Sequence, residues 1–295
     1  MTPDARPSNP ALGIILMIVA IFLFSTMDVA GKMISRNTDT VMAIWARYAG
    51  QTVVVAALVL PRLRRVMRTN YPKLQLLRSV FLLIGTCCFF FGFVNIGLAN
   101  ATAIFNINPV LVTLAAALVL GERFGPRRMF GVAASLVGAL IIIRPGFAIF
   151  SPYAILPMIA ACAYTGYAIT TRFVGRDEDH WTSLLYTAVF GAVIISAIVP
   201  FFWVTPDAFT IGLMLLIGVI GSLGHFCLIR ALTLAEASLL APFTYVGLLF
   251  SIVHGIVFFG EFPEATTYLG ALVIVGAGIY VWHRETQAAR QVPAP

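Results

Sequence analysis

The chain has 295 residues, of which 60% are hydrophobic and only 11% are charged, and its formal net charge is +7. Soluble domains typically carry about 25% charged residues, so this composition excludes an ordinary water-soluble globule. Ten helical crossings of a membrane would use about 200 positions at roughly 20 residues each, which leaves room only for tails and short loops and excludes an added soluble catalytic domain.

Apolar runs of membrane-crossing length, bounded by charged residues, proline or glycine, follow one another along the whole chain. They predict ten transmembrane helices at residues 11–34, 41–60, 76–96, 101–120, 129–143, 153–173, 182–204, 211–232, 239–259 and 266–282. The leader lacks the short apolar core and cleavage site of a signal peptide, so we interpret the first helix as a permanent span. The predicted fold class is an all-α polytopic membrane protein.

The 19 Lys and Arg residues indicate the orientation of these helices, because basic residues are retained on the cytoplasmic side. With a cytoplasmic N-terminus, most of them fall in cytoplasmic segments, and only Lys32, Arg36 and Arg144 fall at external ends. We therefore expect a protein integral to the bacterial inner membrane with both termini cytoplasmic. Membrane lipid beside the basic loops accounts for the net charge, and no nucleic-acid partner is needed.

The four cysteines, Cys87, Cys88, Cys162 and Cys227, fall within the predicted spans and form no C-x-x-C pair. No Cys and His share the spacing of zinc ligands, and no P-loop signature indicates ATP binding. We interpret the cysteines as packing residues and expect neither a metal site nor a cofactor.

The two halves of the chain share a pattern at a fixed offset. A shift of 139 positions places Gly121-Glu122 on Gly260-Glu261 and Gly131 on Gly270. Because five spans per half is an odd number, the second half must enter the membrane from the opposite side. This predicts two inverted five-helix repeats, residues 1–147 and 148–295. Such symmetry commonly underlies alternating access and favours a secondary carrier, the alternative being a duplicated scaffold without transport.

Short motifs also resemble a known family in their order along the chain. They are Met27-Asp28, Lys32, Trp45-Ala46-Arg47-Tyr48, Leu77-Arg78-Ser79, Asn108-Pro109, Leu120-Gly121-Glu122-Arg123 and Arg144-Pro145-Gly146. This order is similar to the EamA branch of the drug/metabolite transporter superfamily. The resemblance implies a ten-helix carrier, with the first two helices most similar to carriers of riboflavin or S-adenosylmethionine, while other relatives export amino acids or metallophores. Phe262-Pro263 departs from the usual Glu-Arg ending, so the resemblance assigns Glu261 no function.

Three charged residues within or near the spans are the first candidates for substrate binding. Charges at membrane depth cost at least a few kcal/mol each and usually carry function. Asp28 and Lys32 share a helix face and can form an ion pair. Arg47 lies in the outer half of the second span, which enters the membrane from the same side. The planar guanidinium of Arg47 suits a substrate anion, or Asp28 in the empty state. The alternative is that Asp28 only neutralises Arg47 or Lys32 and fixes helix packing.

Neutral polar and aromatic side chains complete the predicted substrate site. They are Asn106, Asn108, Tyr164, Tyr167, Tyr245 and His225. Asn108-Pro109 is expected to break the fourth helix beside a cavity, and the tyrosines would form an aromatic wall for a planar or amphipathic ligand. Helix packing is the alternative role for each of them. For His225, the alternatives are helix packing and proton relay.

Glycines on the fifth and tenth spans form small-residue faces on which helices pack closely. They are Gly131, Gly138, Gly270, Gly276 and Gly278. We expect a structural role for these faces or a role in forming a homodimer.

These patterns together predict a secondary transporter, not an enzyme, whose partner is a small-molecule substrate. The substrate is expected to be a small amphipathic metabolite that is amino-acid-like, nucleoside-like or carboxylate-bearing, moved by alternating access. Export of amino acids or metallophores is one alternative. A membrane-embedded enzyme or a structural scaffold is another, although the sequence contains no H-E-x-x-H, no G-x-S-x-G and no paired intramembrane aspartates.

Overall fold

The computed structural model describes residues 10–119, 126–143, 151–174, 178–234 and 241–290, and these residues form helices but no strand. The longer helices are α1 (Pro10–Asn37), α2 (Thr40–Val59), α4 (Pro72–Ile96), α5 (Leu98–Phe105), α6 (Asn108–Val119), α7 (Pro126–Ile143), α8 (Ile155–Val174), α9 (His180–Ile198), α10 (Ala208–Leu234), α12 (Val246–Phe259) and α13 (Ala265–Arg290). Shorter turns are η1 (Leu60–Arg62), α3 (Leu63–Val66), η2 (Pro152–Ala154), η3 (Val199–Phe202) and η4 (Ala241–Tyr245).

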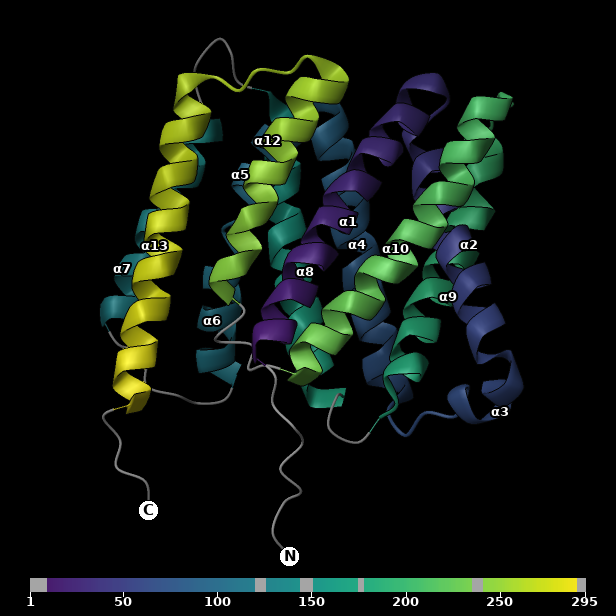
Figure 1. The fold of residues 1–295 in the computed structure, drawn as a ribbon, viewed down its shortest axis with the longest axis horizontal. Coiled ribbons are helices and arrows are strands. Elements are labelled where there is room, and N and C mark those ends of the chain that lie inside the picture. The colour runs from purple at the N-terminus through teal and green to yellow at the C-terminus, as the bar shows by residue number, and fades with distance from the viewer. Residues whose placement is uncertain (1–9, 120–125, 144–150, 175–177, 235–240, 291–295) are drawn as a thin grey trace, which may run out of the picture.

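Ten helical segments correspond to the ten predicted spans (Figure 1). Six are long and apolar enough to cross a membrane: Ala11–Asn37, Thr40–Val66, Pro72–Ile96, Pro152–Thr171, His180–Phe202 and Ala208–Leu228. Four are shorter apolar helices: Leu98–Val112, Ala133–Ile143, Phe243–Phe259 and Ala265–Tyr280. The predicted all-α membrane fold is confirmed. Several predicted features lie outside the described residues: Glu122, the boundaries at Leu120 and Leu239, and the junction at 147/148.

In the described part of the chain, the fourth and ninth spans are not single continuous α-helices. The fourth consists of α5, which ends at Phe105, and α6, which begins at Asn108. Pro109 is the second residue of α6, where its missing N–H costs no helical hydrogen bond. The ninth span begins as η4, which contains Pro242, and continues as α12. The break predicted at Asn108-Pro109 therefore occurs immediately before these two residues.

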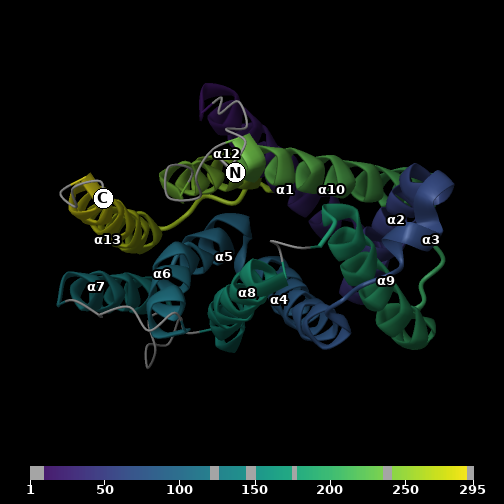
Figure 2. The same ribbon diagram turned by 90° about the horizontal axis from the view of Figure 1, so that it is seen from below.

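Helix packing follows a twofold pattern between the halves of the chain. Helix α1 packs against α10, and in the second half its counterpart α8 packs against α4. The pairs α2–α9, α5–α12 and α7–α13 each join a helix to its own counterpart. Seen from below, α1, α10 and α12 form one row and α4, α5 and α8 form a second row facing it (Figure 2). This arrangement is what two related five-span units predict.

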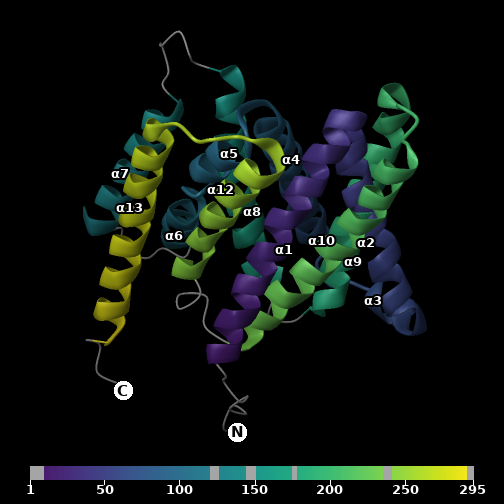
Figure 3. The same ribbon diagram turned by 45° about the horizontal axis from the view of Figure 1, so that its top comes forward.

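The start of α1 and the end of α13 lie at the same end of the bundle, which we call the N/C end (Figures 1 and 3). The opposite end, which we call the far end, holds the connections from α1 to α2 and from α12 to α13. The largest buried apolar cluster combines residues such as Ile34, Ile44 and Phe93. These residues lie where α1 ends, α2 begins and α4 ends, so the cluster packs the helices tightly at the far end.

The glycine faces of α7 and α13 are turned toward each other within the chain. A Cβ atom on Gly270 would lie 2.5 Å from the carbonyl oxygen of Gly138, and a Cβ on Gly138 would lie 2.8 Å from that of Gly270. These two glycines therefore allow close contact between the last helices of the two halves.

Candidate functional site

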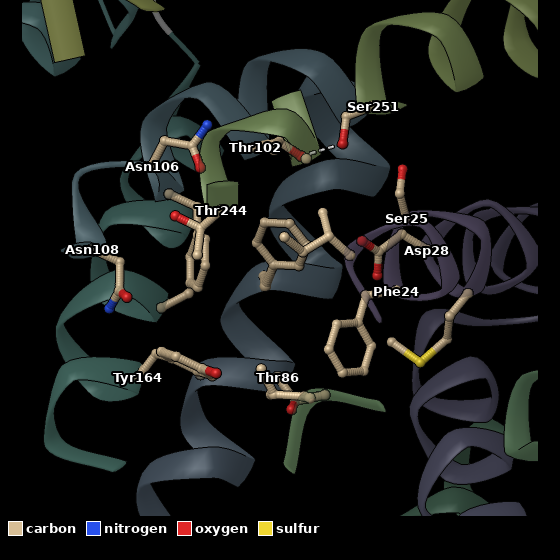
Figure 4. A pocket seen from close by; sticks show the side chains of 18 of the residues that line it. Phe24, Ser25, Asp28, Thr86, Thr102, Asn106, Asn108, Tyr164, Thr244 and Ser251 are labelled. Atoms are coloured by element: carbon tan, nitrogen blue, oxygen red, sulfur yellow. Dashed lines mark hydrogen bonds between the residues drawn. The ribbon is translucent and has the colours of Figure 1, made fainter. Parts of the chain in front are cut away.

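A cavity of about 260 Å³ lies between the two rows of helices (Figure 4). Ligand pockets commonly measure about 300–1,000 Å³, so this volume suits a small metabolite. The cavity is lined by residues from both halves of the chain. Its polar lining residues are Ser25, Asp28, Arg47, Thr86, Thr102, Asn106, Asn108, Tyr164, His225, Thr244 and Ser251.

Asp28 supplies the only carboxylate among the described lining residues. It lies on α1 and is 9% exposed. Within the part of the chain that the structure describes, no group donates a hydrogen bond to this carboxylate, although the positive charge of Arg47 acts on it. A desolvated carboxylate without a donor is costly. The cationic group of a ligand would relieve that cost.

Arg47 reaches the cavity from α2 and is held in place by α4. Its Nη1 donates a hydrogen bond to Oγ1 of Thr86, which also accepts one from the hydroxyl of Tyr48 at 3.0 Å. The guanidinium lies 5.3 Å from the ring centre of Tyr48 and 5.9 Å from that of Phe90. Its buried Nε has no acceptor among the described residues. The fork is therefore oriented but incompletely used, as a site for a ligand carboxylate requires.

The two asparagines at the break of the fourth span differ in their hydrogen bonding. The amide of Asn108 donates to the carbonyl of Ala161 at 2.9 Å and to Thr165 at 3.1 Å, which joins α6 to α8. The amide nitrogen of Asn106 is buried and has no acceptor in the described part of the chain. Asn106 therefore lines the cavity with an unpaired, buried amide nitrogen, whereas Asn108 mainly fixes the wall.

Aromatic rings make up much of the remaining wall. The lining includes Phe24, Phe89, Phe90, Phe105 and Tyr164. The ring centres of Phe89 and Phe105 are 5.1 Å apart, and those of Phe105 and Tyr164 are 5.7 Å apart. Such rings pack edge to face with each other and offer flat apolar surface to a ligand.

His225 lines the cavity but its ring is already engaged. Nδ1 lies 2.9 Å from the carbonyl oxygen of Gly221, one turn earlier on α10. The ring centre also lies 4.9 Å from that of Phe24. This geometry fits a histidine that donates from Nδ1 to the backbone and packs in the wall, which is the packing alternative considered for this residue.

Six of the nine predicted site residues line the cavity: Asp28, Arg47, Asn106, Asn108, Tyr164 and His225. The other three point elsewhere. Lys32 forms an ion pair with Glu261 rather than with Asp28. The hydroxyl of Tyr167 accepts a hydrogen bond from Arg78 at 2.8 Å, and the hydroxyl of Tyr245 is directed at Gly278 on α13.

Five of the described polar lining residues were not among the predicted ones, and all five are small hydroxyl side chains: Ser25, Thr86, Thr102, Thr244 and Ser251. Thr86 orients Arg47, and Thr102 donates to Ser251 at 2.9 Å, which connects α5 to α12 across the two halves (Figure 4). Ser25 lies 2.8 Å from Nδ1 of His254. Hydroxyl residues are common in membrane helices, so their presence in an apolar span carries little signal.

Comparisons with known proteins place this geometry in context. A model of the EamA-like transporter family matches residues 11–144 and again residues 151–282. A crystal structure matches with a TM-score of 0.65 at 19% identity, over 96% of this chain and 99% of that chain, which shows a shared fold.

Three relatives illustrate the range of named substrates. A pseudopaline exporter of Pseudomonas aeruginosa is 30% identical over 90% of this chain and 94% of its own. A riboflavin transporter of Rhizobium johnstonii is 28% identical over 97% of this chain and 96% of its own. An S-adenosylmethionine uptake transporter of Rickettsia prowazekii is 22% identical over 94% of each chain.

Proposed function

This chain belongs to the EamA-like transporter family, and from that membership we propose that it is a secondary carrier for a small zwitterionic metabolite. The substrate would carry a carboxylate and a cationic amino group on a partly apolar or planar body. It would cross the bacterial inner membrane by alternating access, through a carrier whose termini are both cytoplasmic.

One observation carries the substrate class: opposite charges with unused hydrogen-bonding capacity line a single cavity. Asp28 has no donor among the described residues, and Nε of Arg47 has no acceptor there. The carboxylate of an amino acid would bind Arg47 and its ammonium would bind Asp28. The aromatic wall that includes Phe105 and Tyr164 would hold the rest of the molecule.

The named substrates of two relatives differ in whether they fit this class. S-adenosylmethionine is an amino acid with an attached nucleoside, and one relative is named for its uptake. Riboflavin carries no such zwitterion, and another relative is named for its transport. The cavity of this chain favours the first kind of ligand because riboflavin would leave Asp28 without a cationic partner.

Alternating access would follow from two repeats, residues 1–147 and 148–295, that cross the membrane in opposite directions. The exchange symmetry of the helix pairs α1–α10 and α4–α8 supports this proposal. Two repeats with interchangeable packing give two states of similar energy, each open to one compartment.

Counterflow in proteoliposomes tests the function directly. Untargeted metabolite profiling of cells with and without the protein would supply candidates, which then compete with S-adenosylmethionine and riboflavin. We expect zwitterionic amino acid derivatives to drive counterflow and riboflavin not to. Arg47→Gln should abolish the exchange, whereas Arg64→Gln, an exposed arginine outside the cavity, should retain it. Transport of riboflavin with no response to zwitterions would overturn the substrate class.

Export of an amino-acid-derived metallophore is a second candidate, favoured by the relative with 30% identity. Metabolite profiling of the culture medium separates the two. Deleting an exporter leaves less of its substrate in the medium, whereas deleting an importer does not.

A further inference from the structure

A cluster of charged groups joins three segments at the far end of the bundle. The carboxylate of Glu261 binds the ammonium of Lys32 on α1, and its Oε1 lies 3.5 Å from the guanidinium of Arg36. Its Oε2 accepts a hydrogen bond from the backbone N–H of Leu98, the first residue of α5, at 3.2 Å. One side chain from the α12–α13 connection therefore ties α1 to α5.

The backbone around Glu261 is shaped for this contact. Gly260 ends α12 in a left-handed conformation with φ of 64°, which turns the chain toward α1 and α5. Gly97 has φ of 88°, and a Cβ there would lie 2.9 Å from Oε2 of Glu261. Phe259 lies beneath both cations, with its ring centre 4.9 Å from Nζ of Lys32 and 4.7 Å from Cζ of Arg36. The site holds a carboxylate closely, and only glycine fits opposite it.

The position of the cluster relative to the cavity indicates its effect. The cavity lining on α1 ends at Asp28, and Lys32 lies one helical turn further toward the far end. On α5, Leu98 lies one turn beyond the lining residue Thr102. The cluster therefore lies directly above the cavity on the far side. Lys32 is 1% exposed, so its charge is shielded from solvent in this state.

We propose that Glu261 and Lys32 form the outer gate of the carrier, an ion-pair latch that closes the cavity at the far end and must break for the cavity to open there. This inference rests on the proposed carrier function. A buried ammonium that loses its partner is strongly destabilised. Asp28, one turn away on the same helix face, supplies the alternative anion for Lys32 when the latch is broken.

Thiol accessibility measures the gate without any substrate. The parent variant carries Ser25→Cys, a near-isosteric probe in the cavity, with the four native cysteines replaced by serine or alanine. A membrane-impermeant cationic thiol reagent is applied to spheroplasts, which present the far end, and separately to inside-out vesicles. We expect Glu261→Gln to raise the labelling rate from the far end about tenfold, a shift of about 1.4 kcal/mol in the gate equilibrium, and to lower the rate from the N/C end. Lys32→Gln should do the same, and adding it to Glu261→Gln should have little further effect.

Asp207→Asn is the matched control for removal of one carboxylate charge at the far end. Asp207 is exposed at the start of α10, where hydrogen bonding with the side chain of Thr210, and with its backbone N–H at 2.8 Å, lowers the pKa of the Asp207 carboxyl. Asparagine caps helices as well as aspartate does, so this variant should label like the parent. Three results would overturn the latch: unchanged labelling of Glu261→Gln, an equal rise in Asp207→Asn, or a rise from both sides of the membrane, which indicates general loosening.

The experiment also distinguishes failure of the latch from failure of the carrier function. If the parent transports substrate but Glu261→Gln labels normally, only the latch is wrong. If no substrate is found but labelling shifts reciprocally between the two faces, the gate stands and the substrate proposal fails.

Discussion

Part of the Arg47 guanidinium at the cavity is already held in place. The role of its geometry can therefore be tested separately from the role of its charge. Nη1 is bound to Thr86, while Nε remains without an acceptor in the described part of the chain. Arg47→Lys keeps the charge but loses the planar fork. Because a hydrogen bond to a charged group is worth about 1.5–3 kcal/mol, we expect substrate affinity to fall roughly tenfold to a hundredfold with normal membrane insertion. Counterflow measures the substrate affinity, and quantified expression measures membrane insertion. Wild-type transport by this variant would remove Arg47 from the site.

At the residue scale, the sequence identifies charged site residues better than it identifies their partners. Asp28 and Arg47 could be selected because charges inside spans are rare and costly. The partner of Lys32 is 229 positions away, and no local pattern predicts such a pairing over the neighbouring Asp28. Tyr245 was selected by type alone, and its direction toward Gly278 depends on how η4 meets α13.

At the scale of elements, Gly97 marks the junction of α4 and α5, where both the backbone conformation and the contact with Glu261 disfavour a side chain. Gly97→Ala places a Cβ against Glu261 and forces an alanine into a backbone conformation that costs about 1–3 kcal/mol. We expect a lower thermal unfolding temperature and faster labelling of the cavity from the far end. Gly212→Ala is the control, because a Cβ on that helical glycine meets nothing within 4 Å. Equal stability of the two variants would contradict this account of the junction.

The contact between α7 and α13 gives a second prediction at this scale. Gly270→Leu should force the two helices apart, because even a Cβ at this position would lie 2.5 Å from a backbone oxygen of α7. Overpacking typically costs about 1–3 kcal/mol, so thermal stability should fall while the KM of the folded fraction stays unchanged. Gly276→Leu on the same helix faces open space and should be nearly neutral. A changed KM in Gly270→Leu would place this contact in the transport cycle instead.

Hydropathy predicts that the ten spans exist. Interruptions within a span can be predicted only where a proline marks them. Asn108-Pro109 indicated a break, and the structure has one between Phe105 and Asn108, while Pro242 lies in the 3₁₀ turn that precedes α12. The third span was expected to end at Ile96, as α4 does, but the fourth was expected to begin at Ala101 rather than Leu98, so the sequence did not indicate that Gly97 alone joins the two helices. Glycine is common in membrane helices, so a single glycine between apolar residues does not by itself indicate a turn.

For the molecule as a whole, the two halves are related but do not pack identically. Within the first half α1 packs against α2 and α4 against α5, whereas in the described part of the second half the counterpart pairs α8–α9 and α10–α12 make at most weak contact. If the protein alternates between two such arrangements, as we propose, the repeat in the sequence carries no information on which half adopts which. That choice depends on the packing at the far end and on the latch at Glu261.

This asymmetry predicts the conformational change of the carrier. If the second state exchanges the packing of the two halves, α8 and α9 should close on each other while α1 and α2 separate. Spin labels at Leu12 and Leu58 report on α1–α2 near the N/C end, and labels at Tyr153 and Ile198 report on α8–α9 near the far end. All four side chains are exposed, so labels fit without disturbing the core. Glu261→Gln should lengthen the first distance and shorten the second in pulsed dipolar spectroscopy, while Asp207→Asn leaves both unchanged. A variant changes these distances only by shifting the populations of states that differ in structure and free energy. Distances that change in the same direction, or do not change, would therefore show that the two states are not related by exchange.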